Sequence, residues 1–113
     1  MKGADAEDLA LKHLLDEGHE LLARNFRVPG GELDLVTRQK GVVVFTEVKH
    51  RHATSHGAAA EMLTARKLAL LRRTAAFFLH KTFGRDDVPC RFDFVAIQGD
   101  VSRGTLLHLE NVE

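Results

Sequence analysis

Two acidic residues and a lysine, placed in two neighbouring apolar segments, are the residues of this chain best suited to catalysis. Asp34 lies in the segment 32–36, and Glu47 and Lys49 follow the apolar run 42–45, with twelve residues between the two acids. Alternate residues of a strand face the same side, so Glu47 and Lys49 project together while Val48 faces the opposite layer. Charged groups at the end of an apolar run are costly to bury without a partner or a task. We therefore interpret them as a candidate metal site for phosphodiester hydrolysis.

The residue types fit a divalent cation that prefers oxygen ligands. Mg²⁺, or Mn²⁺ in its place, takes a few carboxylate oxygens and completes its octahedron with water and substrate phosphate. Adjacent strands lie about 4.8 Å apart, so Asp34 and Glu47 can meet around one ion. The carbonyl of Val48 is a further candidate ligand. Lys49 can orient the attacking water, lower its pKa or neutralise charge that develops on the phosphate.

Two further residues are expected to face this site from helices. Glu7 falls within the apolar stripe of the first helix, which also holds Ala10, Leu11, Leu14 and Leu15. We expect Glu7 to face inward, where it could add a ligand or hold water. Lys67 lies on the apolar arc of the long helix formed by Leu68, Leu71, Ala75, Phe78 and Leu79, so its ammonium could reach a neighbouring phosphate.

Each of these residues also has a structural interpretation. Glu47 and Lys49 could form an exposed cross-strand ion pair on an edge strand, and Asp34 could be a polar residue next to a turn. Glu7 could favour the positive end of the helix dipole. Lys67 could be a surface lysine that packs only its aliphatic stem.

Composition narrows the class of protein. A chain of 113 residues fits one domain, 1–113. One cysteine, Cys90, cannot form an internal disulfide, and no segment is apolar enough for a membrane span, so we expect a cytoplasmic protein with Cys90 buried in a strand. A net charge of zero argues against a protein that simply coats nucleic acid. Residues 48–85 nevertheless hold eight basic residues against one acid, which suits a polyanion or, alternatively, a solvated helix face.

The element order predicts an α/β fold. A helix over about 4–17 ends at Gly18 and precedes strands over 21–27, 32–37 and 42–49 in an antiparallel meander. Residues 50–57, with His50, His52 and His56, are expected to form a loop, and three histidines without a fourth ligand are a weak zinc signal. A helix over 65–83, with an alternative start near Ala58, ends at Gly84. Strands over 90–97 and 105–109 follow, in which Asp93 should pair with an arginine or cap a turn.

The order of an acid, Asp34 and Glu47-Val48-Lys49 resembles the PD-(D/E)XK nuclease superfamily. The whole chain resembles the bacterial YraN family of predicted endonuclease-like proteins, through Gly31-Glu32-Leu33-Asp34, Phe45-Thr46-Glu47-Val48-Lys49, Arg24-Asn25-Phe26-Arg27 and Arg91-Phe92-Asp93. This resemblance implies a restriction-endonuclease-like core: a mixed central β-sheet flanked by helices, with Asp34, Glu47 and Lys49 as the catalytic set. Thr46 and His50 depart mildly from the residues common in the family at these positions.

The chain is also similar to archaeal Holliday-junction resolvases, in which a glutamate on a helix takes the place of Glu7. By this analogy the partner is DNA, with branched or junction DNA as a candidate substrate. Such nucleases are frequently dimers because two strands must be cut, so a homodimer is a candidate assembly that the sequence itself does not reveal. Arg51 and Lys67 are then the expected DNA contacts.

Three functions therefore stand as hypotheses. The first is a Mg²⁺-dependent or Mn²⁺-dependent DNA endonuclease with Glu7, Asp34, Glu47 and Lys49 at its catalytic site. The alternative is an accessory protein that keeps the nuclease fold and binds or helps to process nucleic acid without cleaving it. A purely structural domain with ion-paired acids is the third.

Overall fold

Five strands and two helices build the structure, a computed structural model that describes residues 2–51, 63–85, 87–100 and 104–112. In chain order they are α1 (Lys2–Asp16), β1 (Glu20–Val28), β2 (Gly31–Gln39), β3 (Val42–Arg51), α2 (Ala65–Phe83), β4 (Cys90–Gln98) and β5 (Thr105–Leu109). The predicted order of elements is confirmed. No helix in this described part of the chain has the length and hydropathy of a membrane span.

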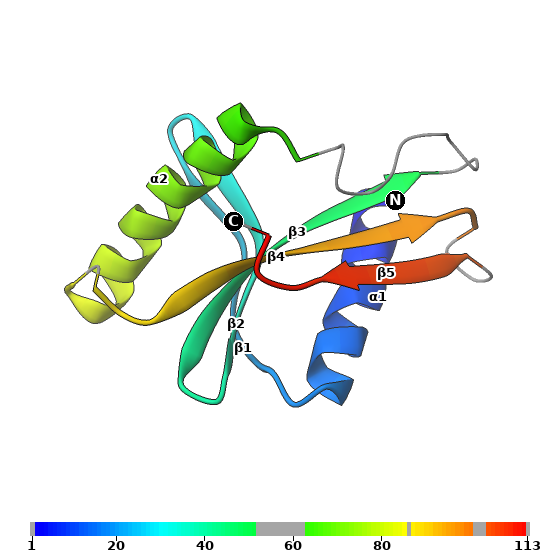
Figure 1. Cartoon of the computed structure of the whole chain (residues 1–113), viewed down its shortest axis with the longest axis horizontal. Coiled ribbons are helices and arrows are strands. Elements are labelled where there is room, and N and C mark those ends of the chain that lie inside the picture. The colour runs from blue at the N-terminus through cyan, green and yellow to red at the C-terminus, as the bar shows by residue number, and fades with distance from the viewer. Residues whose placement is uncertain (1, 52–62, 86, 101–103, 113) are drawn as a thin grey trace.

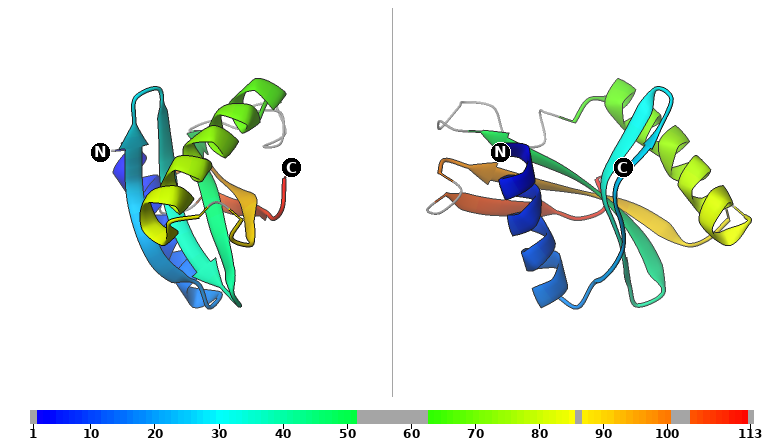
Figure 2. Two further views of the ribbon diagram at one scale, coloured as in Figure 1. Left: turned by 90° about the vertical axis from the view of Figure 1, so that its left-hand side faces the viewer. Right: turned by 180° about the vertical axis from the view of Figure 1, so that it is seen from behind.

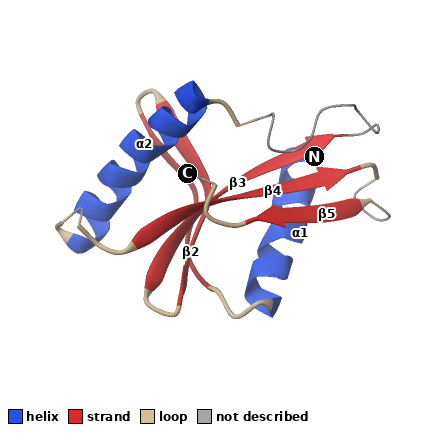
Figure 3. Cartoon of the chain, viewed as in Figure 1, coloured by secondary structure: helices blue, strands red, loops and turns tan. Residues whose placement is uncertain are grey.

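The strands form one mixed sheet in the order β1-β2-β3-β4-β5 (Figure 1). The first three form the predicted antiparallel meander. β4 then runs parallel to β3, and β5 returns antiparallel to β4. The parallel pair needs a crossover, which the segment containing α2 provides. A mixed sheet with helices on both faces is the arrangement predicted for a restriction-endonuclease-like core (Figure 3).

Helix α2 packs on one face of the sheet through an aromatic centre. The Phe78 ring lies edge-on to Phe45, with ring centroids 5.9 Å apart, and Phe45 stacks on Phe92 at 5.4 Å. The predicted apolar arc is the buried side of this helix. Thr64 begins the helix by accepting a hydrogen bond from the Lys67 N–H, and Gly84, with a φ of 76°, ends it. The core and both caps thus fix where Lys67 stands.

Helix α1 covers the opposite face (Figure 2). Ala6, Ala10 and Leu14 are buried against a cluster that includes Leu35. The expected stripe was wrong for Leu15, which is 47% exposed. At 100° per residue Leu15 lies about half a turn round the helix from Ala6, outside the buried face.

Three further expectations concern the strand ends. β3 continues to Arg51, so the prediction that a loop starts at His50 was wrong; the ring of His50 reaches the Gly99 carbonyl, 2.7 Å away. The expectation of a buried Cys90 was also wrong, because this cysteine is the exposed first residue of β4 and burial in that strand begins at Phe92. His52, His56 and the alternative start at Ala58 lie outside the described residues.

Candidate active site

The candidate site lies where strands β2 and β3 separate. Their pairing runs from Gln39 with Val42 to Leu35 with Thr46 and goes no further. Beyond that point the N–H of Val48 donates to Oδ2 of Asp34 across 2.9 Å. A side chain thus takes the position that a backbone acceptor would occupy in a continuous ladder. Since the N–H and carbonyl of one strand residue face the same neighbour, the Val48 carbonyl is directed toward this gap as well.

Both acids project toward α2. They line one pocket together with Lys67, Leu70 and Leu71 of that helix. Phe45, two residues before Glu47 on the same side of β3, belongs to the core under α2. Glu47 is 7% exposed on a central strand. The interpretation of Glu47 and Lys49 as an exposed pair on an edge strand was therefore wrong.

Two lysines meet the buried carboxylate of Glu47. Lys67 Nζ lies 2.9 Å from Oε2 of Glu47, and Lys49 Nζ lies 3.7 Å from the same oxygen. Lys67 thus reaches into the site from α2, as the helical arc predicted, and is more than a solvated surface lysine. The two ammonium groups come from different elements and share one acid.

The pKa of Asp34 reflects both its burial and the neighbouring Glu47. Burial, followed by the charge of the neighbouring Glu47, raises the pKa of Asp34 to about 7, although the Val48 N–H acts in the opposite direction. The Glu7 carboxylate adds a smaller effect in the raising direction. Without a cation between them, the charge of Glu47 disfavours the charged form of Asp34. This is the electrostatic situation that a bound divalent cation relieves.

The two lysines are perturbed in opposite directions. The adjacent Lys67 side chain and burial lower the pKa of Lys49. Burial works against the charged form of Lys67, but Lys49 and the Glu47 carboxylate outweigh it and raise the pKa of Lys67. Lys67 is thus the lysine that stays charged as the counter-ion of Glu47, and Lys49 is the lysine that is more easily deprotonated.

These side chains surround a pocket of about 260 Å³. The pocket is large enough for a cation with its water and one phosphate group, and one wall is apolar. Its lining consists of Glu32, Asp34, Glu47, Val48, Lys49, Lys67, Leu70 and Leu71.

Glu7 and Arg51 are not part of the pocket lining. Glu7 faces inward as predicted, with its side chain 17% exposed, and its Oε1 lies 3.4 Å from Nε of Arg24. This ion pair lies beyond the first turn of α1. Arg51 is exposed at the end of β3, two residues past Lys49 on the same side of the strand. The structure thus unites Asp34, Glu47, Lys49 and Lys67 and leaves Glu7 and Arg51 at the margin.

The donor set fits a hard divalent cation. Its donors are carboxylate oxygens of Asp34 and Glu47 with the Val48 carbonyl at the gap, and oxygen donors of this kind suit Mg²⁺ and Mn²⁺. Across the described residues, no three histidine, cysteine or acidic side chains form a complete metal cage. A cation here would therefore depend on water and substrate for its remaining ligands, as Mg²⁺ in phosphoryl sites does.

Glu32 and Leu70 line the pocket but were not among the predicted site residues. Glu32 precedes Asp34 by two positions, so the strand alternation that links Glu47 with Lys49 could have identified it. It pairs with Arg27, with Oε2 3.2 Å from Nε. Leu70 follows Lys67 by three positions on α2, which places it on a neighbouring part of the helix surface.

Asp93 belongs to a different cluster on the α1 side of the sheet. It is buried and accepts hydrogen bonds from Nε of Arg91 at 3.0 Å and from the backbone N–H of Asn111 at 3.0 Å. The ring of His108 lies 2.8 Å from its second oxygen. The expected pairing of Asp93 with an arginine is confirmed, and its role is structural.

Comparison with known proteins identifies the family. A family model described as "Uncharacterised protein family UPF0102" matches residues 6–97. A UPF0102 protein of Deinococcus radiodurans is 46% identical over 106 residues, which cover 93% of this chain and 86% of that protein. One of Shewanella amazonensis is 50% identical over 98 residues, covering 87% of this chain and 89% of that protein. One of Pseudomonas entomophila is 46% identical over 102 residues, which cover 90% of this chain and 83% of that protein. With a family model spanning most of its length and relatives this similar, the chain belongs to the uncharacterised protein family UPF0102.

Proposed function

We propose that this protein is a divalent-metal-dependent DNA endonuclease of the PD-(D/E)XK superfamily that hydrolyses phosphodiester bonds in the cytoplasm. The observation that supports it most is the convergence of Asp34, Glu47 and Lys49 in one pocket at the β2–β3 gap. In this pocket burial and the charge of Glu47 raise the pKa of Asp34, and two lysines, Lys49 and Lys67, share the Glu47 carboxylate. Such a cluster is typical of a catalytic site.

The side chains take distinct roles in this proposal. Asp34 and Glu47, with the Val48 carbonyl, would hold Mg²⁺ or Mn²⁺. A bound cation of this kind supplies a Lewis acid for water and phosphate. Lys49, with its lowered pKa, orients the attacking water and accepts or shares its proton. Lys67 moves from Glu47 to the phosphate and neutralises its developing charge.

Glu7 and Arg51 act from the margin. Glu7 adds negative potential at Asp34 and holds water next to the metal site. Arg51, exposed two residues beyond Lys49, contacts a phosphate further along the DNA. By similarity to the junction resolvases, branched DNA is the first substrate to examine, and a homodimer would place a second site for the second strand.

A cleavage assay tests the proposal. Purified protein is incubated with linear, nicked and four-way-junction DNA in Mg²⁺, Mn²⁺ or EDTA. We expect metal-dependent cleavage that Glu47→Ala reduces by about 100-fold or more, as loss of a central electrostatic group does. Glu20→Ala is the matched control, because Glu20 is an exposed glutamate paired with Arg38 on β2. Cleavage that persists unchanged in Glu47→Ala would come from a contaminant and would refute the assignment.

One observation favours the accessory protein as a second candidate. The Lys67 ammonium already neutralises Glu47 at 2.9 Å, and a site of this kind can bind DNA without cutting it. In that case Asp34→Ala retains the DNA affinity of the wild type, and neither protein cleaves any of the three DNA forms in either metal. The nuclease proposal predicts that only the variant fails to cleave.

A further inference from the structure

Helix α2 carries a second ordered surface on the side that faces away from the sheet. Arg66, Leu70, Arg73, Phe77 and His80 recur at spacings of three and four residues, and we call this set the outer stripe. At 100° per residue they fall within about 80° of the helix circumference. Leu70 is 41% exposed and Phe77 is 50% exposed, although Phe78 beside them is in the core. The stripe is therefore amphipathic without being part of the fold's interior.

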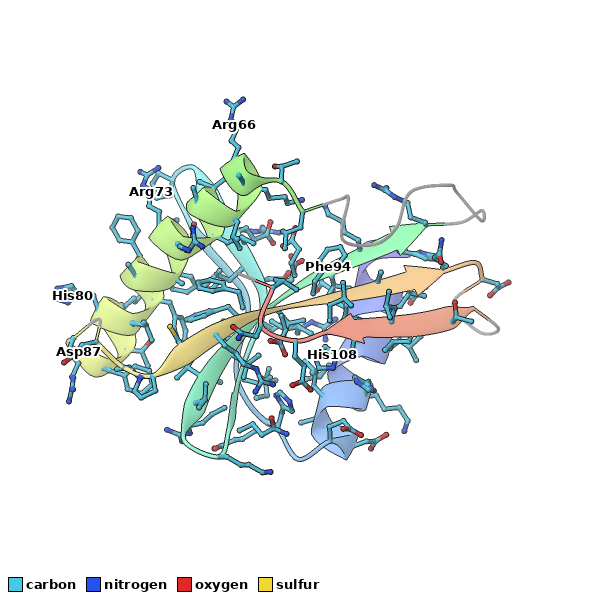
Figure 4. The ribbon with its side chains drawn as sticks, in the orientation of Figure 1. Arg66, Arg73, His80, Asp87, Phe94 and His108 are labelled. Atoms are coloured by element: carbon cyan, nitrogen blue, oxygen red, sulfur yellow. The ribbon has the colours of Figure 1, made fainter. Side chains whose placement is uncertain are left out.

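The outer stripe is strongly cationic. Helix α2 contains Arg66, Lys67, Arg72, Arg73 and Lys81 and no acidic residue. Within the described residues neither Arg66 nor Arg73 forms an ion pair with a carboxylate. Figure 4 shows Arg66, Arg73 and His80 on the same outward side of the helix. Their charge is thus available to an anionic partner.

An aromatic ring lies among these cations. The guanidinium carbon of Arg73 is 6.0 Å from the centroid of the Phe77 ring. Arginine over an aromatic face presents two flat groups next to each other, on which a nucleic-acid base can stack. The small side chains of Ala69 and Ala76 protrude little from the helix surface beside Arg73 and Phe77.

Two open grooves follow the outer stripe and lead to the candidate active site. The first is lined by Thr64, Arg66, Lys67, Ala69, Leu70 and Arg73, and the second by Arg73, Ala76, Phe77 and His80. Arg73 belongs to both grooves, while Lys67 and Leu70 line both the first groove and the pocket with Asp34 and Glu47. From Arg66 to His80 the helix rises about 21 Å. The surface is a continuous path of several nucleotides' length.

Single-stranded nucleic acid is the partner that this chemistry fits. Its phosphates match unopposed arginines, and its unpaired bases expose faces that can stack on Phe77 and Arg73. A duplex hides those faces. A second copy of the chain fits poorly, because a twofold contact would set this acid-free helix against itself and bring arginine to arginine.

We propose that the outer stripe is a track that binds single-stranded nucleic acid, or the unpaired arm of a branched substrate, and leads it to the Asp34–Glu47 pocket. The inference that this track leads to the pocket rests on the proposed function. Phe77 stacks on a base, and Arg66 and Arg73 bind the flanking phosphates. The substrate class is therefore nucleic acid with an unpaired segment.

Fluorescence anisotropy with a labelled thymine oligonucleotide of about 15 nucleotides tests the track. EDTA is present, so binding is measured without cleavage. We expect Phe77→Ala to weaken binding roughly 5- to 150-fold, the loss of one stacked base. Arg66→Ala with Arg73→Ala should lower the slope of log K against log salt by about 1.4, since each phosphate contact on a single strand contributes about 0.7.

Matched controls lie away from the stripe. Leu15→Ala removes an equally exposed apolar side chain from α1, and Arg38→Ala removes a partly exposed arginine from β2. Both should bind as the wild type does. Far-UV circular dichroism verifies that the half-exposed Phe77 can be replaced without loss of the fold.

Three results would overturn the proposal. The first is wild-type affinity and salt slope in the Phe77 and arginine variants, and the second is equal affinity for a blunt hairpin duplex. The third is a dimer detected by sedimentation velocity. If Phe77→Ala dissociates this dimer and the oligonucleotide does not, the outer stripe is an interface between copies of the chain. Strand binding without cleavage of any DNA would refute the nuclease and leave the track, whereas cleavage lost in Glu47→Ala with unaltered Phe77→Ala binding would refute the track alone.

Discussion

At the scale of single residues, the molecule holds two kinds of buried acid. Burial, followed by the charge of the neighbouring Glu47, raises the pKa of Asp34. Asp93 faces Arg91 and His108 and has a lowered pKa, because their hydrogen bonds outweigh the effect of burial. A bound cation would offset the unfavourable interaction between Asp34 and Glu47, whereas the contacts of Asp93 stabilise the fold. This contrast separates the candidate site from the structural polar cluster.

Asp34→Asn should stabilise the metal-free protein at neutral pH. The pKa of Asp34 is about 7 in the folded state, against 3.8 for an aspartate in an unfolded chain, so between these values the folded protein binds more protons than the unfolded chain. Stability contributed by Asp34 therefore falls as pH rises from about 4 to 7 and is level above that. The variant should match the wild type near pH 4 and exceed it at pH 8, by on the order of a few kcal/mol.

Urea unfolding in EDTA from pH 4 to 8 measures this difference. Asp16→Asn is the control, because Asp16 is an exposed acid paired with Lys12. A wild-type protein as stable as Asp34→Asn at pH 8 would show that burial and the charge of Glu47 do not raise the pKa of Asp34 in the folded state.

Asp93→Asn should have the opposite effect. Asp93 is 1% exposed, and its replacement leaves the Arg91 guanidinium without its charged partner, at a cost of roughly 2–5 kcal/mol. Since its pKa is lowered in the folded state, its stabilisation is present above pH 4 and is lost as pH falls below that.

Thermal unfolding at pH 7 and at pH 3 checks this expectation. The deficit of Asp93→Asn should be large at pH 7 and smaller at pH 3, while Asp87→Asn, which alters an exposed pair with Arg85, should change little at either pH. An equal deficit at both pH values would contradict a charged Asp93.

At the scale of the elements, the site depends on how closely α2 approaches β2. Gly31 begins β2, and a Cβ at this position would overlap the hydroxyl of Thr74 on α2. Thr74 is itself buried and donates to the Leu70 carbonyl across 3.0 Å. This close contact sets the distance between the helix that carries Lys67 and the strand that carries Asp34.

A double-mutant cycle tests that contact. Gly31→Ala should destabilise the protein by roughly 1–3 kcal/mol through overpacking. Thr74→Ala in the same chain should recover part of the loss, because it removes the hydroxyl that the new methyl group meets. Additive free energies of unfolding in urea would show that the two residues are not in contact.

The elements themselves could be predicted because their boundaries are local. Gly30, with a φ of 83°, and the Lys40-Gly41 turn, with φ values of 52° and 80°, end strands at residue types that favour such conformations. The site acids were predictable because a charge within an apolar run is conspicuous. The separation of β2 from β3 after Leu35 was not, since it depends on pairing between strands. The Lys67–Glu47 ion pair and the exposure of Cys90 depend likewise on how elements meet.

At the scale of the whole molecule, the two faces of the sheet differ in what they hold. The α1 side holds the apolar cluster of Leu14 and Leu35 together with the Asp93 cluster. The α2 side holds the pocket and, on the outer surface of its helix, an acid-free row of arginines. A chain with zero net charge thus concentrates its positive charge next to its paired acids, which suits an anionic polymer bound at a metal site.

A crystal grown with Mn²⁺ tests whether a divalent cation binds between Asp34 and Glu47. We expect an anomalous difference peak about 2.1 Å from one oxygen of each carboxylate, with the Val48 carbonyl beside it and Lys67 displaced from its 2.9 Å contact with Glu47. The contrary result is a map with no peak in this pocket at saturating Mn²⁺ and with Lys67 still on Glu47.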